Sequence, residues 1–385
     1  MREQVAGVQP SVLQWAREAQ GYSVEDVAER LKRKPEEVRA WELGESAPTY
    51  AQLEDLAYRI YKRPLAVFFL PAPPSEPNPR QEFRTLPDTE LDALTADTRY
   101  QLRLAHAYQL SLHDLNDGVN PAARKIFREH RLSVIEPPER AAVAVRLTLE
   151  VALAAQLRWR STDEALKAWR NAVEERGIYV FKNSFRQRSI SGFSLFDEEF
   201  PVIVLNNSAA KSRQIFSLFH ELCHVLLHSN SITTFDDGPI ERLPEDQRRI
   251  ERYCNVFAAE VLLPSDTVNP LLRNLRQVDE QAVTTLADRF HVSRETVLRR
   301  ALDLTLVDRT YYQTMVRRWA DEATPRGEGG NYYATQSTYL GEKFLQLVFG
   351  QYYQGTITRE QVSDYLGIKS KSVDGMEAML LGKAV

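Results

Sequence analysis

Apolar residues recur at helical spacing through residues 1–70, which predicts a compact helical unit. Ser23 and Asp26 stand three residues apart in the pattern of a reciprocal helix cap. Pro35 suits the first turn of a later helix, and Gly44 suits its end. Two helices joined by a short turn are typical of a helix-turn-helix. We therefore expect residues 1–70 to form a helix-turn-helix domain of the five-helix type.

The pattern breaks at residues 71–79, where five of nine residues are proline. Proline cannot continue a helix and favours an extended spacer, so we predict a proline-rich linker over residues 71–90. Helical spacing then returns and predicts a helical region over residues 91–176. Its expected helices lie near 95–116, 138–158 and 162–176.

After residue 176 the period of the apolar positions changes from helical to short runs. Three runs rich in β-branched and aromatic residues predict a small three-stranded sheet, at 178–181, 192–196 and 202–205. Asn206, Asn207 and Ser208 can cap a following helix that extends to about His228. Further helices are expected near 245–263, 279–290 and 294–304.

The chain as a whole is predicted to be mostly helical and of the α+β class. The region from 177 to 306 holds the small sheet and forms one domain. The region from 307 to 385 is a C-terminal helical region, in which the glycine-rich segment 327–330 precedes a separate small helical piece.

Composition narrows the function classes. The chain has 385 residues with 49 basic and 53 acidic side chains, a net charge of −4, which argues against a protein that coats nucleic acid or a membrane surface. Its two cysteines cannot form a disulfide framework, so a reducing compartment is expected. No stretch approaches the roughly 18 apolar residues of a membrane span, and the first residues lack an apolar signal segment. We therefore expect a cytoplasmic protein with no membrane partner.

The sequence carries a candidate metal site at His220-Glu221-Leu222-Cys223-His224. At about 100° per residue, His220 and His224 differ by only about 40° around a helix, one turn apart. Both imidazoles can therefore reach one Zn²⁺ ion. Glu221 stands beside them, where it suits a general base acting on a water at the metal.

A third ligand is less clear from the spacing. His228 lies two turns beyond His220, about 12 Å along the axis, so a supporting or capping role suits it better than sharing the ion. The other candidates are acidic residues of the next predicted helix. Glu251 borders the apolar stripe of that helix, and a carboxylate there needs a partner or a metal to offset its desolvation. We prefer Glu251 to the alternatives, which are Glu260, Glu245 and Asp246.

Two segments resemble the ImmA/IrrE family of zinc metallopeptidases. Residues 213–228 contain the H-E-x-x-H motif, and residues 251–264 match the family's E-x-x-A-N-x-F-A-x-x-L-L-x-P pattern. The resemblance covers about residues 175–304 and implies a zincin-like domain in which Glu251 is the third zinc ligand and Glu221 the catalytic base. It extends more loosely to the N-terminal unit, because many relatives carry an XRE-like helix-turn-helix, and to Glu82-Phe83-Arg84.

The resemblance implies a zinc endopeptidase. Its implied substrate is a protein, typically a helix-turn-helix repressor, cleaved in a stress, mobile-element or toxin–antitoxin response. Two alternatives stay open: a helix-turn-helix transcription regulator, or an antitoxin-like interaction protein, each with a structural zinc site. An intact Glu221 argues against a purely structural site, which needs no base.

The chain departs from the family pattern at its two cysteines. Cys223 and Cys254 stand where the family usually has Gly and Ala, one on each proposed metal-bearing helix. They either fill a tight helix–helix contact or form a redox-sensitive pair whose oxidation distorts the site. The residue that stabilises the oxyanion is also open, and the candidates are Tyr253, Arg213, His228 and Tyr179.

DNA binding by the N-terminal unit is also left open. Residues 1–70 contain 10 basic and 11 acidic side chains, and the candidate recognition helix carries Glu36, Glu37 and Glu42 against a single Arg39. Phosphate contacts need basic charge on the docking face. The candidate DNA contacts are Arg39 and the preceding Lys32, Arg33 and Lys34. The alternative interpretation is that the domain recognises a protein partner.

Overall fold

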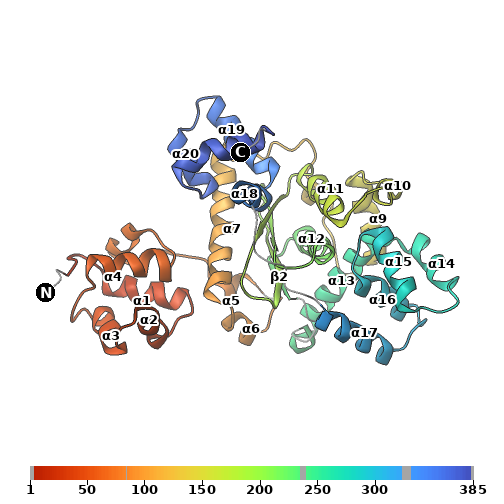
Figure 1. The fold of residues 1–385 in the computed structure, drawn as a ribbon, viewed down its shortest axis with the longest axis horizontal. Helices are drawn as coiled ribbons and strands as arrows, with labels where there is room; N and C mark the ends of the chain where they lie inside the picture. Colours follow the sequence, from red (N-terminus) through yellow and green to blue (C-terminus); the bar gives the residue numbers. More distant parts are fainter. Residues whose placement is uncertain (1–3, 84, 235–239, 323–330, 383–385) are drawn as a thin grey trace. The chain divides into compact units, whose positions relative to one another are not determined.

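The structure is a computed structural model of the chain, and its fold is α+β and mostly helical, as predicted (Figure 1). Two compact units are present: one joins the residues up to 82 with 88–104, and the other joins 83–87 with the residues from 105 onward. No helix in the described part of the chain is long and apolar enough to cross a membrane. The described residues are 4–83, 85–234, 240–322 and 331–382.

The first unit contains the predicted helix-turn-helix. Ser23 caps the second helix: its hydroxyl accepts from the Asp26 amide at 3.0 Å, and the Asp26 carboxylate accepts from the Ser23 amide at 2.7 Å. Gly44 ends the third helix in the left-handed region, at φ 75°. Both local signals are confirmed. The elements are α1 (Pro10–Ala19), α2 (Val24–Leu31), α3 (Pro35–Leu43) and α4 (Tyr50–Glu54), which continues as a π-helical turn (Asp55–Ile60), and a 3-10 turn (Leu65–Phe69).

The proline-rich segment after this core is not a free spacer. Arg63 is buried, and its guanidinium pairs with Glu76, with Nη2 and Oε2 2.8 Å apart, which ties the segment to the unit. The predicted linker also contains two short helices, α5 (Pro79–Glu82) and α6 (Asp88–Asp92). The long helix α7 (Ala96–Leu115) follows.

The sheet of the second unit has four strands, not the three predicted. Its order is β1 (Tyr179–Asn183), β3 (Val202–Asn206), β2 (Ile190–Leu195) and β4 (Ser231–Thr234). β1 runs parallel to β3, whereas β2 is antiparallel to both β3 and β4. Strand β4 was not predicted, because it has only four residues, three of them polar, and lacks an apolar run.

The outer edge of β4 is covered by the segment that joins the two parts of the first unit. The Thr85 hydroxyl donates to the Ile232 carbonyl at 2.9 Å and accepts from the Ile232 amide at 2.8 Å. Phe83 is buried beside it, while Arg84 of the Glu82-Phe83-Arg84 signature lies outside the described residues. A side chain thus satisfies backbone groups that an exposed edge strand would leave free.

Helices pack on both faces of the sheet (Figure 1). α12 (Lys211–Leu226) lies on one face, against β2 and β3, and α13 (Glu245–Leu262) packs on α12. On the other face, the Tyr108 ring of α7 stacks on Phe181 of β1 with the ring centroids 4.0 Å apart. The sheet is therefore buried on both sides, and all five residues of β3 are buried.

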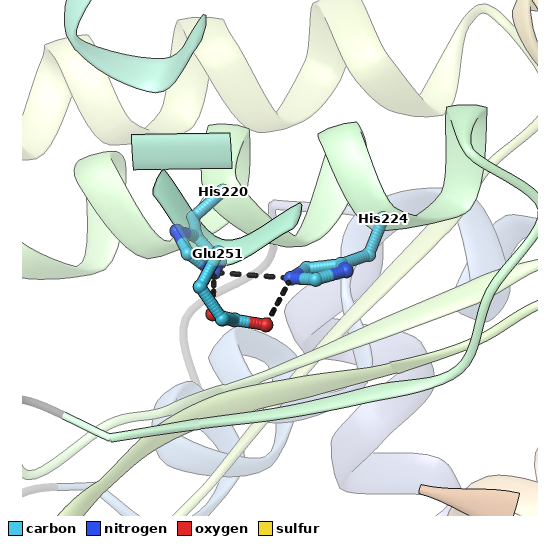
Figure 2. A group of neighbouring side chains, drawn as sticks. All are labelled: His220, His224 and Glu251. Atoms are coloured by element: carbon cyan, nitrogen blue, oxygen red, sulfur yellow. Dashed lines mark hydrogen bonds and ion pairs between the residues drawn. The ribbon is translucent and has the colours of Figure 1, made fainter. Parts of the chain in front are cut away.

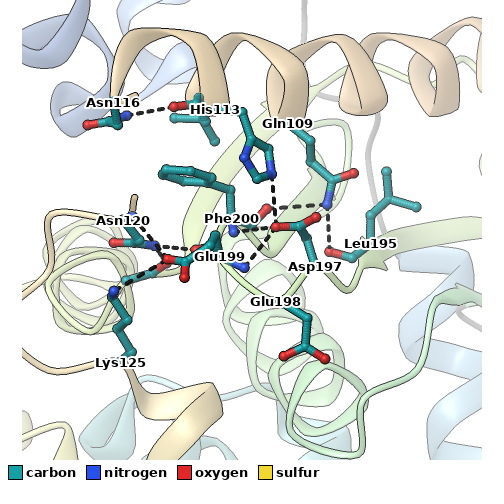
Figure 3. Close-up of polar contacts among 12 residues, drawn as sticks. Gln109, His113, Asn116, Asn120, Lys125, Leu195, Asp197, Glu198, Glu199 and Phe200 are labelled. Carbon is teal, nitrogen blue, oxygen red and sulfur yellow. Dashed lines mark hydrogen bonds and ion pairs between the residues drawn. The ribbon is translucent and has the colours of Figure 1, made fainter. Parts of the chain in front are cut away.

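The turn between β2 and β3 is held by α7 (Figure 3). The Gln109 amide donates to the Leu195 and Phe200 carbonyls at 3.2 Å. The His113 Nε2 atom lies 3.1 Å from the Asp197 carboxylate, which also accepts from the Phe200 amide at 2.7 Å. These contacts pair the polar groups of the turn with protein partners and keep β2 and β3 in register.

Two local predictions differ from the structure. The helix expected near 138–158 is two helices, because the chain turns at Glu150, where φ is 58°. The expected cap at residues 206–208 is a turn instead: the Asn206 side chain accepts from the Ser208 amide at 3.1 Å, and α12 starts after Ala210.

The second unit contains further helices beside those described above. The segment 327–330, expected to break the chain, lies outside the described residues. The helices that follow it pack on the sheet unit, where the Arg170 guanidinium donates to the Thr338 carbonyl at 2.8 Å. The elements are α8 (Ile126–Glu129), α9 (Pro138–Thr148), α10 (Leu153–Gln156), α11 (Thr162–Glu174), a 3-10 turn (Ile240–Arg242), α14 (Ser265–Arg273), α15 (Glu280–Phe290), α16 (Arg294–Asp303), α17 (Arg309–Glu322), α18 (Tyr332–Leu340), α19 (Glu342–Tyr353), α20 (Arg359–Leu366), a 3-10 turn (Ser370–Ser372) and α21 (Val373–Leu380).

Candidate metal centre

The H-E-x-x-H segment lies on α12, which packs against β2 and β3. A Cβ atom at Gly192 of β2 would be in ordinary contact with Cγ of Glu221, at 3.7 Å, but only 2.9 Å from the Val204 carbonyl oxygen of the neighbouring strand β3. Apolar residues on both sides of the motif bury α12, so His220 and His224 are 1% and 0% exposed.

Three side chains converge between α12 and α13 (Figure 2). The Nε2 atoms of His220 and His224 lie 3.1 Å apart. The Glu251 carboxylate lies 3.2 Å from the first and 3.3 Å from the second. These are the only residues in the described part of the chain whose ligand atoms group in this way.

The spacing of these donor atoms fits a metal ion. Ligands about 2.0–2.1 Å from a tetrahedral Zn²⁺ ion stand about 3.3 Å from one another, close to the separations seen here. Oε1 of Glu251 is buried and accepts no hydrogen bond, an arrangement that costs free energy in a side chain without a metal. Two imidazoles and one carboxylate are also the usual donor set of a catalytic zinc site, which keeps its fourth position open.

The residues around the centre orient its side chains. His220 Nδ1 lies 2.9 Å from the Asn255 side-chain oxygen, so it donates there and leaves Nε2 free to act as a ligand. This hydrogen bond, assigned from the contact, fixes the tautomer that a metal requires. The Cys254 thiol lies within hydrogen-bonding reach of His224.

The charges at the centre support one another. Burial works to raise the pKa of Glu251, but His224 and His220 outweigh it and lower that pKa to about 2. Burial likewise works to lower the pKa of His224, yet Cys254 and Glu251 raise it well above its usual range. The carboxylate is therefore held in the ionised form that a metal ligand needs.

Glu260, the weaker candidate for third ligand, is engaged elsewhere. Its carboxylate accepts from the Ser265 amide at 2.7 Å and pairs with the Arg300 guanidinium at 2.8 Å. It thereby binds the first amide of α14 and neutralises the partly buried Arg300. Glu245 lies at the exposed start of α13, where it pairs with Arg248, and Asp246 lies beside it in the first turn.

Glu221 points to the sheet, not along the row of the two histidines. It is 0% exposed, and its Oε2 atom accepts hydrogen bonds from Ser194 and Ser231, while Oε1 is buried without a partner. One oxygen is thus anchored and the other is available to a reacting group.

The oxyanion candidates from the sequence have other contacts. His228 Nε2 lies 3.1 Å from the Phe127 carbonyl, and Arg213 pairs with Glu295 at 2.8 Å. Tyr253 follows Glu251 by two residues on α13, and its hydroxyl is buried without a hydrogen-bond partner. The Tyr179 ring lies on the opposite face of the sheet, with the Lys343 ammonium 5.4 Å from its centroid. None of the four has a described contact with the three converging side chains.

The two cysteines lie together at the α12–α13 contact. Both are fully buried and unpaired by a disulfide. Burial, together with a hydrogen bond between Cys254 and Cys223, raises the pKa of Cys254 well above its usual range. The Cys254 thiol is therefore held in its protonated form, and both side chains fill the helix–helix contact.

The basic residues of the helix-turn-helix are exposed but only partly available. Lys32, Arg33 and Lys34 lie at the solvent-exposed turn between α2 and α3. Arg39 is paired with Glu25 and lies 3.8 Å from Glu36. The outer face of α3 is therefore close to neutral.

The segment that carries this centre is similar to known proteins. Residues 173–302, which include both metal-bearing helices, match the peptidase family model described as the IrrE N-terminal-like domain. Residues 13–57 match a helix-turn-helix model, in the part of the chain where the sequence predicts a helix-turn-helix.

Two curated relatives share part of this chain. The radiation response metalloprotease IrrE of Deinococcus deserti is 31% identical over 141 residues, which cover 35% of this chain and 46% of that protein. The radiation response metalloprotease IrrE of Deinococcus radiodurans is 32% identical over 103 residues, covering 27% of this chain and 31% of that protein. The chain thus matches less than half the length of either relative.

Three residues at the centre were not predicted from the sequence: Asn255, Ser194 and Ser231. Asn255 stands inside the quoted E-x-x-A-N pattern, four residues after Glu251, so helical spacing could have placed it near His220. Ser194 and Ser231 lie on strands, and β4 was not predicted at all. Their approach to Glu221 depends on strand pairing, for which the sequence carries no local signal.

Proposed function

We propose that the protein is a zinc-dependent endopeptidase. His220, His224 and Glu251 hold the zinc, and Glu221 is the general base. The observation that carries the proposal is the convergence of two imidazole nitrogens and one carboxylate, 3.1–3.3 Å apart, beside a buried glutamate with one free oxygen. The metalloprotease names of the two relatives support it.

The protein's own residues divide the work of peptide hydrolysis. Bound zinc supplies Lewis-acid chemistry, which polarises a carbonyl and makes a water more acidic. Glu221 takes a proton from the attacking water at Oε1 and returns it to the leaving amine. Asn255 holds His220 in the ligand tautomer. Burial of the centre excludes bulk water and strengthens these interactions.

The proposed substrate is a protein, specifically a helix-turn-helix repressor whose cleavage switches on a stress, mobile-element or toxin–antitoxin response. The match of residues 13–57 to a helix-turn-helix model supports a link to transcription. The competing functions, a regulator or an antitoxin-like partner with a structural zinc, do not need Glu221 as a base.

Co-expression with the product of the adjacent gene tests the proposal. The full chain should shorten that product, and Glu221→Gln should leave it intact while keeping its zinc. Glu245→Gln, at the exposed start of α13, is the matched control and should cleave like the wild type. A biological effect that survives Glu221→Gln would show that peptide hydrolysis is not the function.

We propose DNA binding as the role of the helix-turn-helix, on the strength of its family match. Lys32, Arg33 and Lys34 would contact phosphates, since α3 itself is nearly neutral. Binding should therefore be weak and strongly salt-dependent. The full chain should retard its own promoter DNA at low salt, and Lys32→Glu with Lys34→Glu should abolish the shift. Unretarded DNA at low salt would favour a protein partner instead.

A further inference from the structure

The Glu221 carboxylate has a dedicated pair of hydrogen-bond donors. The Ser194 hydroxyl of β2 donates to Oε2 at 3.0 Å, and the Ser231 hydroxyl of β4 donates to the same oxygen. The two hydroxyl oxygens also lie 2.7 Å from each other. Two neighbouring strands thus meet one side chain of α12.

The three side chains of this arrangement are buried away from solvent. Ser194, Ser231 and Glu221 are each 0% exposed, so water does not replace a lost hydroxyl. Side chains two residues apart on a strand share a face, which directs Ser194 and Gly192 of β2 together toward α12. Gly192 lies beside Glu221, and the Ser194 hydroxyl holds the end of the glutamate side chain.

The two carboxylate oxygens of Glu221 have different contacts. Oε2 accepts from both serines, whereas Oε1 is buried and has no partner. A carboxylate anchored at one oxygen cannot rotate freely about its last bond. The other oxygen is then presented in one direction, as a proton acceptor requires.

We infer that Ser194 and Ser231 are positioning residues, which anchor Oε2 of Glu221 so that Oε1 faces the group whose proton it accepts. The inference rests on the proposed function, since it gives Glu221 the role of base. Neither serine touches the three converging metal-binding side chains in any described contact, so their loss should spare the metal.

Ser191 provides a matched control. It lies on the same strand pair and is buried, but its hydroxyl donates to the Thr233 carbonyl at 3.1 Å and not to Glu221. Ser191→Ala therefore removes an equally buried hydroxyl from the same sheet without touching the base.

The test uses the zinc-loaded full chain and acetohydroxamic acid as the probe. A hydroxamate chelates zinc through two oxygens and hydrogen-bonds to an adjacent carboxylate, so its affinity reports how that carboxylate is aimed. Titrations compare Ser194→Ala, Ser231→Ala, the double alanine variant and Ser191→Ala. Glu221→Gln gives the value expected when the carboxylate is absent, and zinc affinity is measured for every variant by chelator competition.

The double alanine variant should bind acetohydroxamic acid about tenfold more weakly, the effect of two hydrogen bonds, with zinc affinity unchanged. Ser191→Ala should bind like the wild type, and a double threonine variant, which keeps both hydroxyls, should recover most of the loss. If the double alanine variant binds acetohydroxamic acid as tightly as the wild type while Glu221→Gln binds it weakly, the positioning role of the serines is wrong and the role of Glu221 as base still stands. Equal affinity in Glu221→Gln and the wild type would overturn the base role and this inference together.

Discussion

Helix α13 buries two carboxylates, nine residues apart, in opposite ways. Glu260 is paired with the Arg300 guanidinium and the Ser265 amide, so its charge is neutralised by the fold itself. Glu251 meets only two imidazoles, and its Oε1 atom accepts no hydrogen bond. A buried charge that the fold fully satisfies contributes to structure, whereas one left incompletely satisfied marks a place for a ligand.

The largest difference is expected in folding stability. Glu260→Gln should lower the free energy of unfolding by about 3–5 kcal/mol, because it leaves the Arg300 guanidinium buried without its counter-charge. Glu251→Gln in chelator-treated protein should cost less than Glu260→Gln, since the imidazole partners of Glu251 can lose their protons and become neutral, whereas a guanidinium cannot. Urea unfolding measures both, with Glu245→Gln as the exposed control. Equal losses for Glu251 and Glu260 would remove the distinction between them.

Lys182 of β1 extends the comparison to a buried charge of the opposite sign. Burial, and then Lys211 and Arg170, lower its pKa to about 7 from 10.5. Between those values the unfolded chain binds more protons than the folded one, so stability rises with pH. Lys182→Met should therefore stabilise the protein by roughly 2–4 kcal/mol near pH 6, and the gain should vanish near pH 10.

Urea unfolding across this pH range checks the Lys182 expectation. Lys167→Met, at an exposed position of α11, is the control and should show no such trend. A gain for Lys182→Met that does not change with pH would mean that the ammonium is not destabilised by burial.

Asn255 of α13 orients His220, one of the two proposed histidine ligands. Asn255→Ala removes the acceptor that orients His220, and it should weaken zinc binding by about 10- to 100-fold, the usual effect of such a partner. Chelator competition measures the change. Val256→Ala, at the next and more exposed position, should bind zinc normally. Unchanged affinity in Asn255→Ala would mean that His220 needs no orienting partner.

The smallest effect is expected at the cysteine pair. We propose that peroxide oxidises Cys223 and Cys254 to a disulfide, which displaces His224 and lowers zinc affinity a few-fold, and that a thiol reductant restores it. Cys223→Ser should be insensitive to peroxide. If peroxide lowers the zinc affinity of this variant and of the wild type equally, the two cysteines only fill the helix–helix contact.

Local sequence signals predicted the elements that local chemistry determines. The cap at Ser23, the end of α3 at Gly44 and the H-E-x-x-H helix each depend on residues within one or two turns. Helical spacing alone brought the two histidines to one face, where the structure has their Nε2 atoms 3.1 Å apart.

Features that depend on contacts distant in sequence were missed or left open. Strand β4 is short and polar, and it exists because β2 and Thr85 satisfy its two edges. Spacing favoured Glu251 over Glu260 only by its place beside the apolar stripe, since the sequence does not reveal that Arg300, 40 residues further on, pairs with Glu260. The serines at Glu221 required a sheet register that no local pattern specifies.

The zinc content of two variants shows whether Glu251, and not Glu260, is the third zinc ligand. Wild type, Glu251→Gln and Glu260→Gln are each purified, dialysed against a weak chelator and measured by elemental analysis. The account predicts that wild type and folded Glu260→Gln retain one zinc ion per chain and that Glu251→Gln retains almost none. Full zinc occupancy in Glu251→Gln, or loss of zinc only in folded Glu260→Gln, would contradict it.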